Sequence, residues 1–191
     1  MTPPTFIVGI GGSAGGLAAY KDLLDALSPQ LGMAFVIVAH LLPEASSQLA
    51  LILSSHTKMK VTVATTGATI RRNHVYVIPP NADLLMKGVE LKIISPRTGR
   101  NKQVDLFFGS LAEAMGVHAI GVILSGYDGD GTEGCRQIKQ RGGTTFSQDG
   151  SAEVTDMPCS AEASGNVDFV LSPAKIAAEL QRMAKAALSK R

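Results

Sequence analysis

Three polar side chains that could work together as a nucleophile, a base and an acid each follow an apolar, strand-like segment. In chain order these are Ser13 after residues 6–10, His40 after residues 34–39, and Asp128 and Asp130 after residues 119–124. In such a set the imidazole takes the serine proton near pH 7, and the carboxylate orients the imidazole. The sequence therefore predicts hydrolysis by a serine nucleophile, and spacing alone leaves the choice between Asp128 and Asp130 open.

The glycine-rich loop around Ser13 has three interpretations. Residues 11–15 (GGSAG) fit G-x-S-x-G, a tight turn that exposes a serine hydroxyl before a helix whose N-terminus favours an oxyanion. Residues 9–14 also fit the loose dinucleotide fingerprint, but that site expects an acidic residue after the second strand, where His40 stands. In the third interpretation Ser13 only caps the helix. The loop alone does not separate these alternatives.

His40 and the aspartate loop also have simpler interpretations. A single histidine after an apolar strand is often a hydrogen-bonded structural residue, and the aspartates could be solvated carboxylates in a glycine-rich turn. The loop does not fit a calcium-binding EF-hand, because Thr and Lys occupy the positions of the third and last ligands. The predicted position of His40 favours a catalytic role, since adjacent parallel strands would bring its ring to the same sheet edge as Ser13.

Strand-like and helix-like segments alternate through most of the chain. The strand-like runs are residues 6–10, 34–39, 61–63, 75–78, 119–124, 144–146 and 169–171. Helix-like patterns lie at residues 17–27, 49–53, 106–114, 132–140 and 173–188. This alternation predicts an α/β layered fold with a mostly parallel sheet, in which the most apolar run, 119–124, is central. Residues 83–95 instead predict an antiparallel hairpin that turns at Lys87-Gly88.

Apolar spacing predicts which side of two helices faces the core. In the first helix the predicted inner face consists of Leu17, Leu23, Leu24 and Leu27. In the helix near residue 110 it consists of Leu106, Phe107, Ser110, Leu111 and Ala114.

Length and composition indicate one ordinary globular domain over residues 1–191. The formal charge of +2 and the scattered basic residues argue against a nucleic-acid partner. Cys135 and Cys159 match no zinc or redox spacing, so we expect neither a metal nor a cofactor. No stretch approaches the roughly 20 apolar residues of a membrane span, and no signal-length segment opens the chain. We therefore expect a cytoplasmic protein.

Several segments match one family in order and spacing, from about Phe6 to the closing helix. They are residues 10–16 (IGGSAGG), 38–41 (VAHL), 74–80 (HVYVIPP), 104–110 (VDLFFGS), 124–131 (LSGYDGDG), 148–149 (QD) and 157–158 (MP). The chain resembles the catalytic domain of the CheB-type protein-glutamate methylesterases. This resemblance implies a doubly wound, three-layer α/β/α fold with a β-hairpin insertion. It also implies a triad of Ser13, His40 and Asp130, which selects Asp130 over Asp128.

The same resemblance implies a reaction and a substrate. The expected activity is hydrolysis of γ-glutamyl methyl esters on the helical cytoplasmic bundle of a chemoreceptor, with release of methanol through an acyl-enzyme. Some family members also deamidate glutamine there. The oxyanion would be held by backbone N–H groups of the glycine-rich loop, at Gly12 and Ala14, and of Tyr127, which stands where chemotaxis members often have Met.

Departures from the family pattern qualify these expectations. The chain is most similar to the methylesterase modules fused to methyltransferases, and it has no N-terminal receiver domain. We therefore expect regulation, or a methyltransferase, to be supplied by a separate partner. Asp128 adds a charge beside the predicted acid, and Cys159 stands where the family usually has Arg. The alternative function is a catalytically idle module that binds a receptor or another signalling partner.

Overall fold

A seven-stranded parallel sheet forms the centre of the molecule. The computed structural model describes residues 3–41 and 48–189, and its sheet has the order β3-β4-β2-β1-β7-β8-β9. The strands are β1 (Ile7–Gly12), β2 (Ala34–Ala39), β3 (Lys60–Val63), β4 (His74–Val77), β7 (Ala119–Ile123), β8 (Thr144–Gln148) and β9 (Phe169–Leu171). Every predicted strand is present. The most apolar run, β7, lies one place from the middle of the sheet, which is occupied by β1.

The strand order changes direction at β1. The chain first adds β2 on one side of β1 and later adds β7 on its other side, in registers that pair Gly12 with Ala39 and Gly11 with Ile123. All three strands are buried at every position, as expected of the apolar interior of a parallel sheet. A topological switch of this kind leaves a crevice at the carboxyl ends of the strands, where ligands bind in open α/β sheets.

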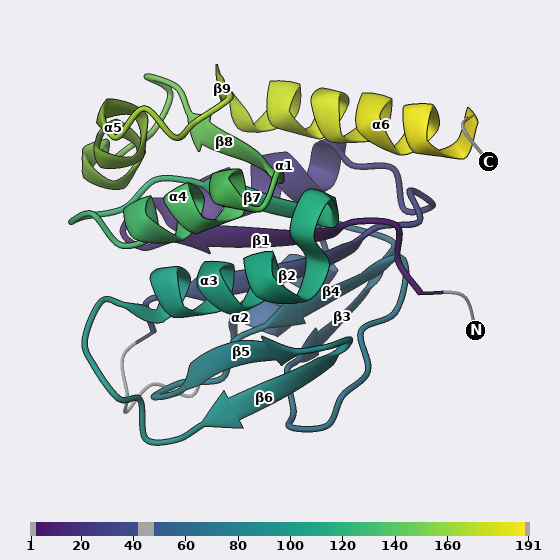
Figure 1. Cartoon of the computed structure of the whole chain (residues 1–191), viewed down its shortest axis with the longest axis horizontal. Helices are drawn as coiled ribbons and strands as arrows, with labels where there is room; N and C mark the ends of the chain where they lie inside the picture. The colour runs from purple at the N-terminus through teal and green to yellow at the C-terminus, as the bar shows by residue number, and fades with distance from the viewer. Residues whose placement is uncertain (1–2, 42–47, 190–191) are drawn as a thin grey trace.

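Helices cover both faces of the sheet, which gives the expected three-layer α/β/α fold (Figure 1). One layer consists of α1 (Gly16–Ala26), α2 (Leu49–Ser54) and α6 (Pro173–Ser189). The other consists of α3 (Gln103–Met115), α4 (Thr132–Gln140) and α5 (Asp156–Ala163). A short 3₁₀ turn, η1 (Gly116–His118), connects α3 to β7. None of the described helices combines the length and hydrophobicity needed to cross a membrane.

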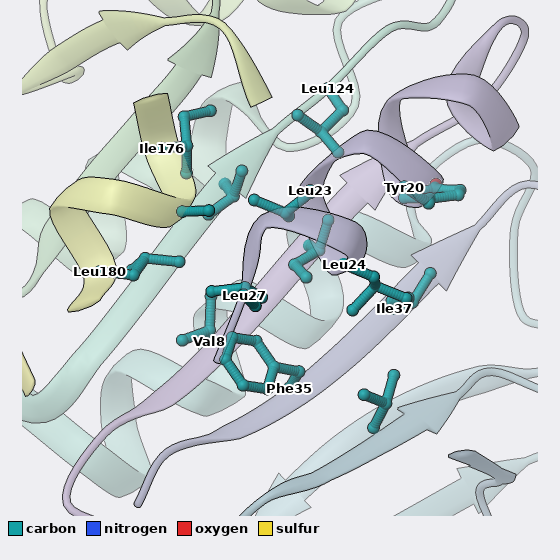
Figure 2. Packing of buried hydrophobic residues seen from close by; sticks show 14 of the residues in the cluster. Val8, Tyr20, Leu23, Leu24, Leu27, Phe35, Ile37, Leu124, Ile176 and Leu180 are labelled. Atoms are coloured by element: carbon teal, nitrogen blue, oxygen red, sulfur yellow. The ribbon is translucent and has the colours of Figure 1, made fainter. Parts of the chain in front are cut away.

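The first helix packs on the middle of the sheet through a face centred on Leu23. Figure 2 shows Leu27 beside Val8 and Phe35 of the sheet and Leu24 beside Ile37, with Ile176 and Leu180 of α6 in the same cluster. The prediction for Leu17 is wrong, because its side chain is 39% exposed. The buried stripe begins instead at the small residues Gly16 and Ala19 and continues through Leu23 and Leu24.

On the opposite face, α3 buries Phe107 and Phe108 against β1 and β7. Phe108 fills a space that small residues leave open: a Cβ atom added to Gly9 or Gly121 would lie within 2.8 or 2.9 Å of its ring. The predicted inner face of this helix is therefore displaced by about one residue. Leu106 is 37% exposed, and Val104 takes its place in the core.

We expect Phe108→Ala to lower the free energy of unfolding by roughly 3–5 kcal/mol, because removal of the buried ring leaves a cavity in the core. Chemical denaturation of the whole chain measures this change. Leu106→Ala on the same helix is the matched control and should change stability by less than about 0.5 kcal/mol. Equal losses in the two variants would contradict the packing described for α3.

The predicted hairpin is confirmed as β5 (Asp83–Lys87) and β6 (Glu90–Ile94), which pair in antiparallel register. It forms a separate two-stranded sheet beside α3 (Figure 1). Leu84 and Leu91 join the core on that side, and the N–H of Met86 donates to the Ser110 hydroxyl at 2.9 Å. The hairpin thereby supports α3, whose N-terminus reaches the crevice of the sheet.

Candidate active site

The loops that follow β2, β1 and β7 meet at the carboxyl edge of the sheet. The backbone N–H of His40 donates to the Gly12 carbonyl at 3.3 Å, and the N–H of Ser13 donates to the Ser125 carbonyl at 2.9 Å. These bonds continue the sheet by one residue beyond each strand. The three predicted functional segments are therefore neighbours in space, as parallel pairing of their strands requires.

His40 and Asp130 form a direct hydrogen bond in this crevice. The Nε2 atom of His40 lies 2.7 Å from Oδ2 of Asp130, and the two side chains are 8% and 0% exposed. An ionised carboxylate only accepts hydrogen bonds, so Nε2 carries the proton of the neutral ring. The second ring nitrogen, Nδ1, is then the one with a free electron pair. The contact leaves His40 ready to accept a proton at Nδ1.

The N-terminus of α3 holds the Asp130 carboxylate. Its Oδ2 accepts the backbone N–H of Val104 at 3.0 Å, and its Oδ1 accepts that of Asp105 at 2.9 Å. These residues are in the first turn of the helix, whose positive end stabilises a negative charge. A buried carboxylate needs such donors to stay ionised. Asp130 is thus fixed from two directions, by the helix and by His40.

Asp128 has a different role from Asp130. It adopts a left-handed backbone conformation with φ 68°. Its Oδ1 accepts the N–H of Asp130 at 2.8 Å, and its Oδ2 accepts the side-chain amide of Asn101 at 2.6 Å. No hydrogen bond links it to His40 among the described residues. Asp128 therefore shapes the loop that carries Asp130, rather than facing the imidazole.

Ser13 lies in the turn between β1 and α1. The Ser13 carbonyl accepts the N–H of Gly16 at 3.0 Å, and Gly15 caps the helix in a left-handed conformation with φ 71°. The Ser13 hydroxyl forms no hydrogen bond within the part of the chain that the structure describes. Its Cβ is close to Gly126, where an added side chain would contact it at 2.9 Å. The hydroxyl is thus unengaged at the mouth of the crevice, and in unliganded enzymes a nucleophile often contacts its base only once substrate binds.

The three predicted oxyanion residues differ in their backbone surroundings. Gly12 is the last residue of β1 and is paired with Ala39 in the sheet. The N–H groups of Ala14 and Tyr127, by contrast, have no acceptor among residues 3–41 and 48–189. Tyr127 is 60% exposed. Of the three predicted oxyanion residues, Ala14 and Tyr127 are therefore those whose N–H groups are free of an acceptor in the described part of the chain.

Ser125 connects the loops around Ser13, and its role was not anticipated from the sequence. This buried residue donates its hydroxyl to the Ala14 carbonyl at 2.7 Å and accepts the N–H of Val154 at 2.9 Å. Its own N–H donates to the side chain of Gln148 at 3.0 Å. It also accepts the N–H of Ser13 through its carbonyl. The one feature of the sequence that could have indicated this role is that Ser125 is a polar residue close behind the most apolar strand.

We expect Ser125→Ala to lower kcat by roughly 10-fold, because the serine loop loses its hydrogen bond at Ala14. The same variant should lose about 1–3 kcal/mol of stability, since it leaves buried polar groups without a partner. Steady-state kinetics and denaturation measure the two effects. Thr145→Val is the control: its hydroxyl donates to the Asn166 carbonyl at the other end of the sheet, so stability should fall while kcat stays unchanged. An unchanged kcat in Ser125→Ala would contradict this role.

A groove of about 510 Å³ opens beside the serine loop and extends along α1 to the start of α6. Its wall includes Gly15 and Gln148, and its rim has the acidic side chains of Asp22, Asp25 and Glu153. Within the described residues, no group of three His, Cys, Asp or Glu side chains is arranged to hold a metal ion. The residue types gathered at this sheet edge are those that transfer a proton from a hydroxyl to an imidazole, next to backbone N–H donors.

Comparison with known proteins gives consistent matches. A family model described as CheB methylesterase matches residues 8–180. The chain is 37% identical over 172 residues to a putative protein-glutamate methylesterase/protein-glutamine glutaminase of Leptospira interrogans, covering 88% of this chain and 89% of that one. It is 33% identical over 186 residues to the protein-glutamate methylesterase/protein-glutamine glutaminase of group 3 operon of Rhizobium meliloti, covering 95% of this chain and 52% of that protein.

A solved structure is similar as well. The CheB methylesterase catalytic domain of Thermotoga maritima superimposes with a TM-score of 0.85 and 27% sequence identity, covering 96% of this chain and 100% of that one. The chain thus spans about half of the Rhizobium meliloti relative but the whole of this catalytic domain.

Proposed function

Because this chain belongs to the CheB methylesterase family, we propose that it hydrolyses γ-glutamyl methyl esters on chemoreceptor-like helical proteins and releases methanol. The observation that carries the proposal is the 2.7 Å contact between His40 and Asp130 at the sheet edge that also bears Ser13. A dinucleotide site is disfavoured, because the end of β2 presents this imidazole in place of a ribose-binding carboxylate.

The proposed reaction proceeds through an acyl-enzyme. Ser13 Oγ attacks the ester carbonyl while Nδ1 of His40 takes its proton, and Asp130 stabilises the imidazolium through Nε2. The N–H groups of Ala14 and Tyr127 stabilise the oxyanion. When the tetrahedral intermediate collapses, the C–O bond to the methoxy group breaks, and His40 returns its proton to form methanol. Water then attacks the acyl-serine with the same base, and a free glutamate carboxylate and Ser13 are released.

The same residues could act on a glutamine side chain. In that reaction the leaving group is ammonia instead of methanol, and His40 again supplies the proton. The printed names of both relatives described above include protein-glutamine glutaminase. We therefore include deamidation as a second activity of the same site, with the ester as the better substrate because methoxide is the better leaving group.

The substrate that fits this proposal is a methylated helical bundle in the cytoplasm, which places the enzyme there too. The acidic rim of the groove beside Ser13, with Asp22 and Glu153, would face that bundle. We propose that the chain acts as a single domain, and that regulation or the opposing methyltransferase comes from a separate partner.

Methanol release from methylated chemoreceptor cytoplasmic fragments tests the proposal. Wild-type protein should release methanol in a 1:1 ratio with new carboxylate, and unmethylated fragments should release none. Fragments with glutamine at the modification site should release ammonia more slowly. A folded protein that bound the fragments without releasing methanol or ammonia would refute the enzyme and favour the idle binding module.

A further inference from the structure

Two carboxylates behind His40 each bind the N-terminus of the other's helix. Asp130, which directly precedes Gly131 at the start of α4, accepts the first-turn N–H groups of Val104 and Asp105 in α3. In return, Oδ1 of Asp105 accepts the N–H of Gly131 at 2.9 Å and of Gly134 at 2.8 Å. The residues at the two helix starts provide no side-chain cap themselves. Each helix is therefore capped by a residue distant in sequence.

The backbone at Gly131, directly after Asp130, is tightly packed against its neighbours. Gly131 has φ 96°, and a Cβ atom there would lie 2.8 Å from a methyl group of Val104. The Asp130–Gly131 segment therefore passes directly against α3, and the N–H of Gly131 binds it to Asp105 of that helix. Because Asp105 accepts that N–H, it fixes the residue next to the one that orients the imidazole.

The two neighbouring carboxylates of Asp105 and Asp130 are electrostatically unfavourable. Burial raises the pKa of Asp105, and the neighbouring charge of Asp130 raises it further. Two adjacent carboxylates repel each other, so the pair depends on the N–H donors at the starts of α3 and α4. A helix cap alone could be supplied by a neutral serine or asparagine at the helix start. The cost of placing a second, half-buried carboxylate beside Asp130 indicates that an acceptor oxygen is needed at this position.

We propose that Asp105 is a positioning residue, which holds Asp130 in line with Nε2 of His40 by binding the N–H groups of Gly131 and Gly134. Its effect on catalysis rests on the proposed function, whereas its effect on the His40–Asp130 contact does not. Without the Asp105 carboxylate, the N–H of Gly131 loses its acceptor and the loop that carries Asp130 can turn. The carboxylate then withdraws from the ring, and the Nε2 proton is no longer held.

The test compares Asp105→Ala and Asp105→Asn in the full chain by two measurements. The first is the proton NMR signal of the His40 ring N–H, which lies far downfield when the proton is shared with a carboxylate. The second is the separation of kcat from KM in methanol release. Asp105→Ala should lose the downfield signal and lower kcat by roughly 10- to 100-fold with little change in KM. Asp105→Asn keeps an acceptor oxygen and should restore the signal and most of kcat.

Asp168→Ala is the matched control, because Asp168 also accepts a backbone N–H, that of Thr145, but at the opposite end of the sheet. It should destabilise the protein without changing the ring signal or kcat. If Asp105→Ala does not fold, Asp105→Glu, which keeps the charge but displaces the acceptor, should show the same loss. An unchanged ring signal in folded Asp105→Ala or Asp105→Glu would overturn the proposal, whether or not the wild type releases methanol.

Discussion

Ser13→Ala is expected to lower the rate of methanol release by roughly 10⁴- to 10⁶-fold and to leave the fold intact. The loss is large because the proposed mechanism has no second nucleophile that could replace the Ser13 hydroxyl. Stability should change by less than about 0.5 kcal/mol, since the Ser13 hydroxyl forms no hydrogen bond among the described residues. Quenched-flow methanol detection on methylated receptor fragments, together with a denaturation curve, measures both quantities.

A second readout identifies the covalent step. Rapid acid quenching of the wild-type reaction should trap an acylated peptide that maps to the loop containing Ser13, and Ser13→Ala should trap none. Ser54→Ala is the matched serine control: its exposed hydroxyl contacts only the Leu51 carbonyl, so both the rate and the trapped species should match the wild type. Wild-type turnover by Ser13→Ala would show that another group is the nucleophile.

The sequence was sufficient to predict every strand, every helix except α5, and the edge of the sheet where the three candidate residues lie. Ser13 and His40 directly follow strands, Asp130 lies in the loop after β7, and adjacent parallel strands end at the same edge of the sheet. The order in which those strands pair could not be predicted from local patterns, because it depends on contacts between distant segments. That order decides that β2 and β7 flank β1, and thereby which loops meet.

Helix faces were less predictable, for a physical reason. Leucine spacing placed Leu17 and Leu106 inside, but both residues are more than a third exposed. Glycines on β1 and β7 admit Phe108, and this turns the buried stripe of α3 by about one residue. Hydrophobic periodicity within one helix contains no information about the space that a neighbouring strand leaves open.

Sequence patterns also did not predict the hydrogen-bond network around the site. Ser125 and Ala14 are 111 residues apart, and Asp105 and Gly131 are 26 apart, yet each pair shares a hydrogen bond. Such bonds depend on the relative placement of loops and not on local propensity. The same limit applied to the aspartate loop, in which spacing left Asp128 and Asp130 equivalent.

Asp130→Asn is expected to lower kcat by roughly 10⁴-fold with a much smaller effect on KM. Three N–H groups point at the Asp130 carboxylate: those of His40, Val104 and Asp105. An asparagine has only one oxygen, so its amide must face at least one of these donors. If it faces the imidazole, the ring proton moves to Nδ1, and His40 can no longer accept the proton of Ser13.

Asp128→Asn distinguishes the two aspartates that the sequence left open. Asparagine at position 128 can still accept the N–H of Asp130 and keeps its left-handed backbone at low cost, so kcat should fall by less than about 10-fold. Both variants are assayed by methanol release, with the ring N–H signal of His40 as a reporter of the tautomer. Equal losses in the two variants would mean that loop geometry, and not a carboxylate facing the imidazole, limits turnover. A small loss in Asp130→Asn alone would remove Asp130 from the proposed triad.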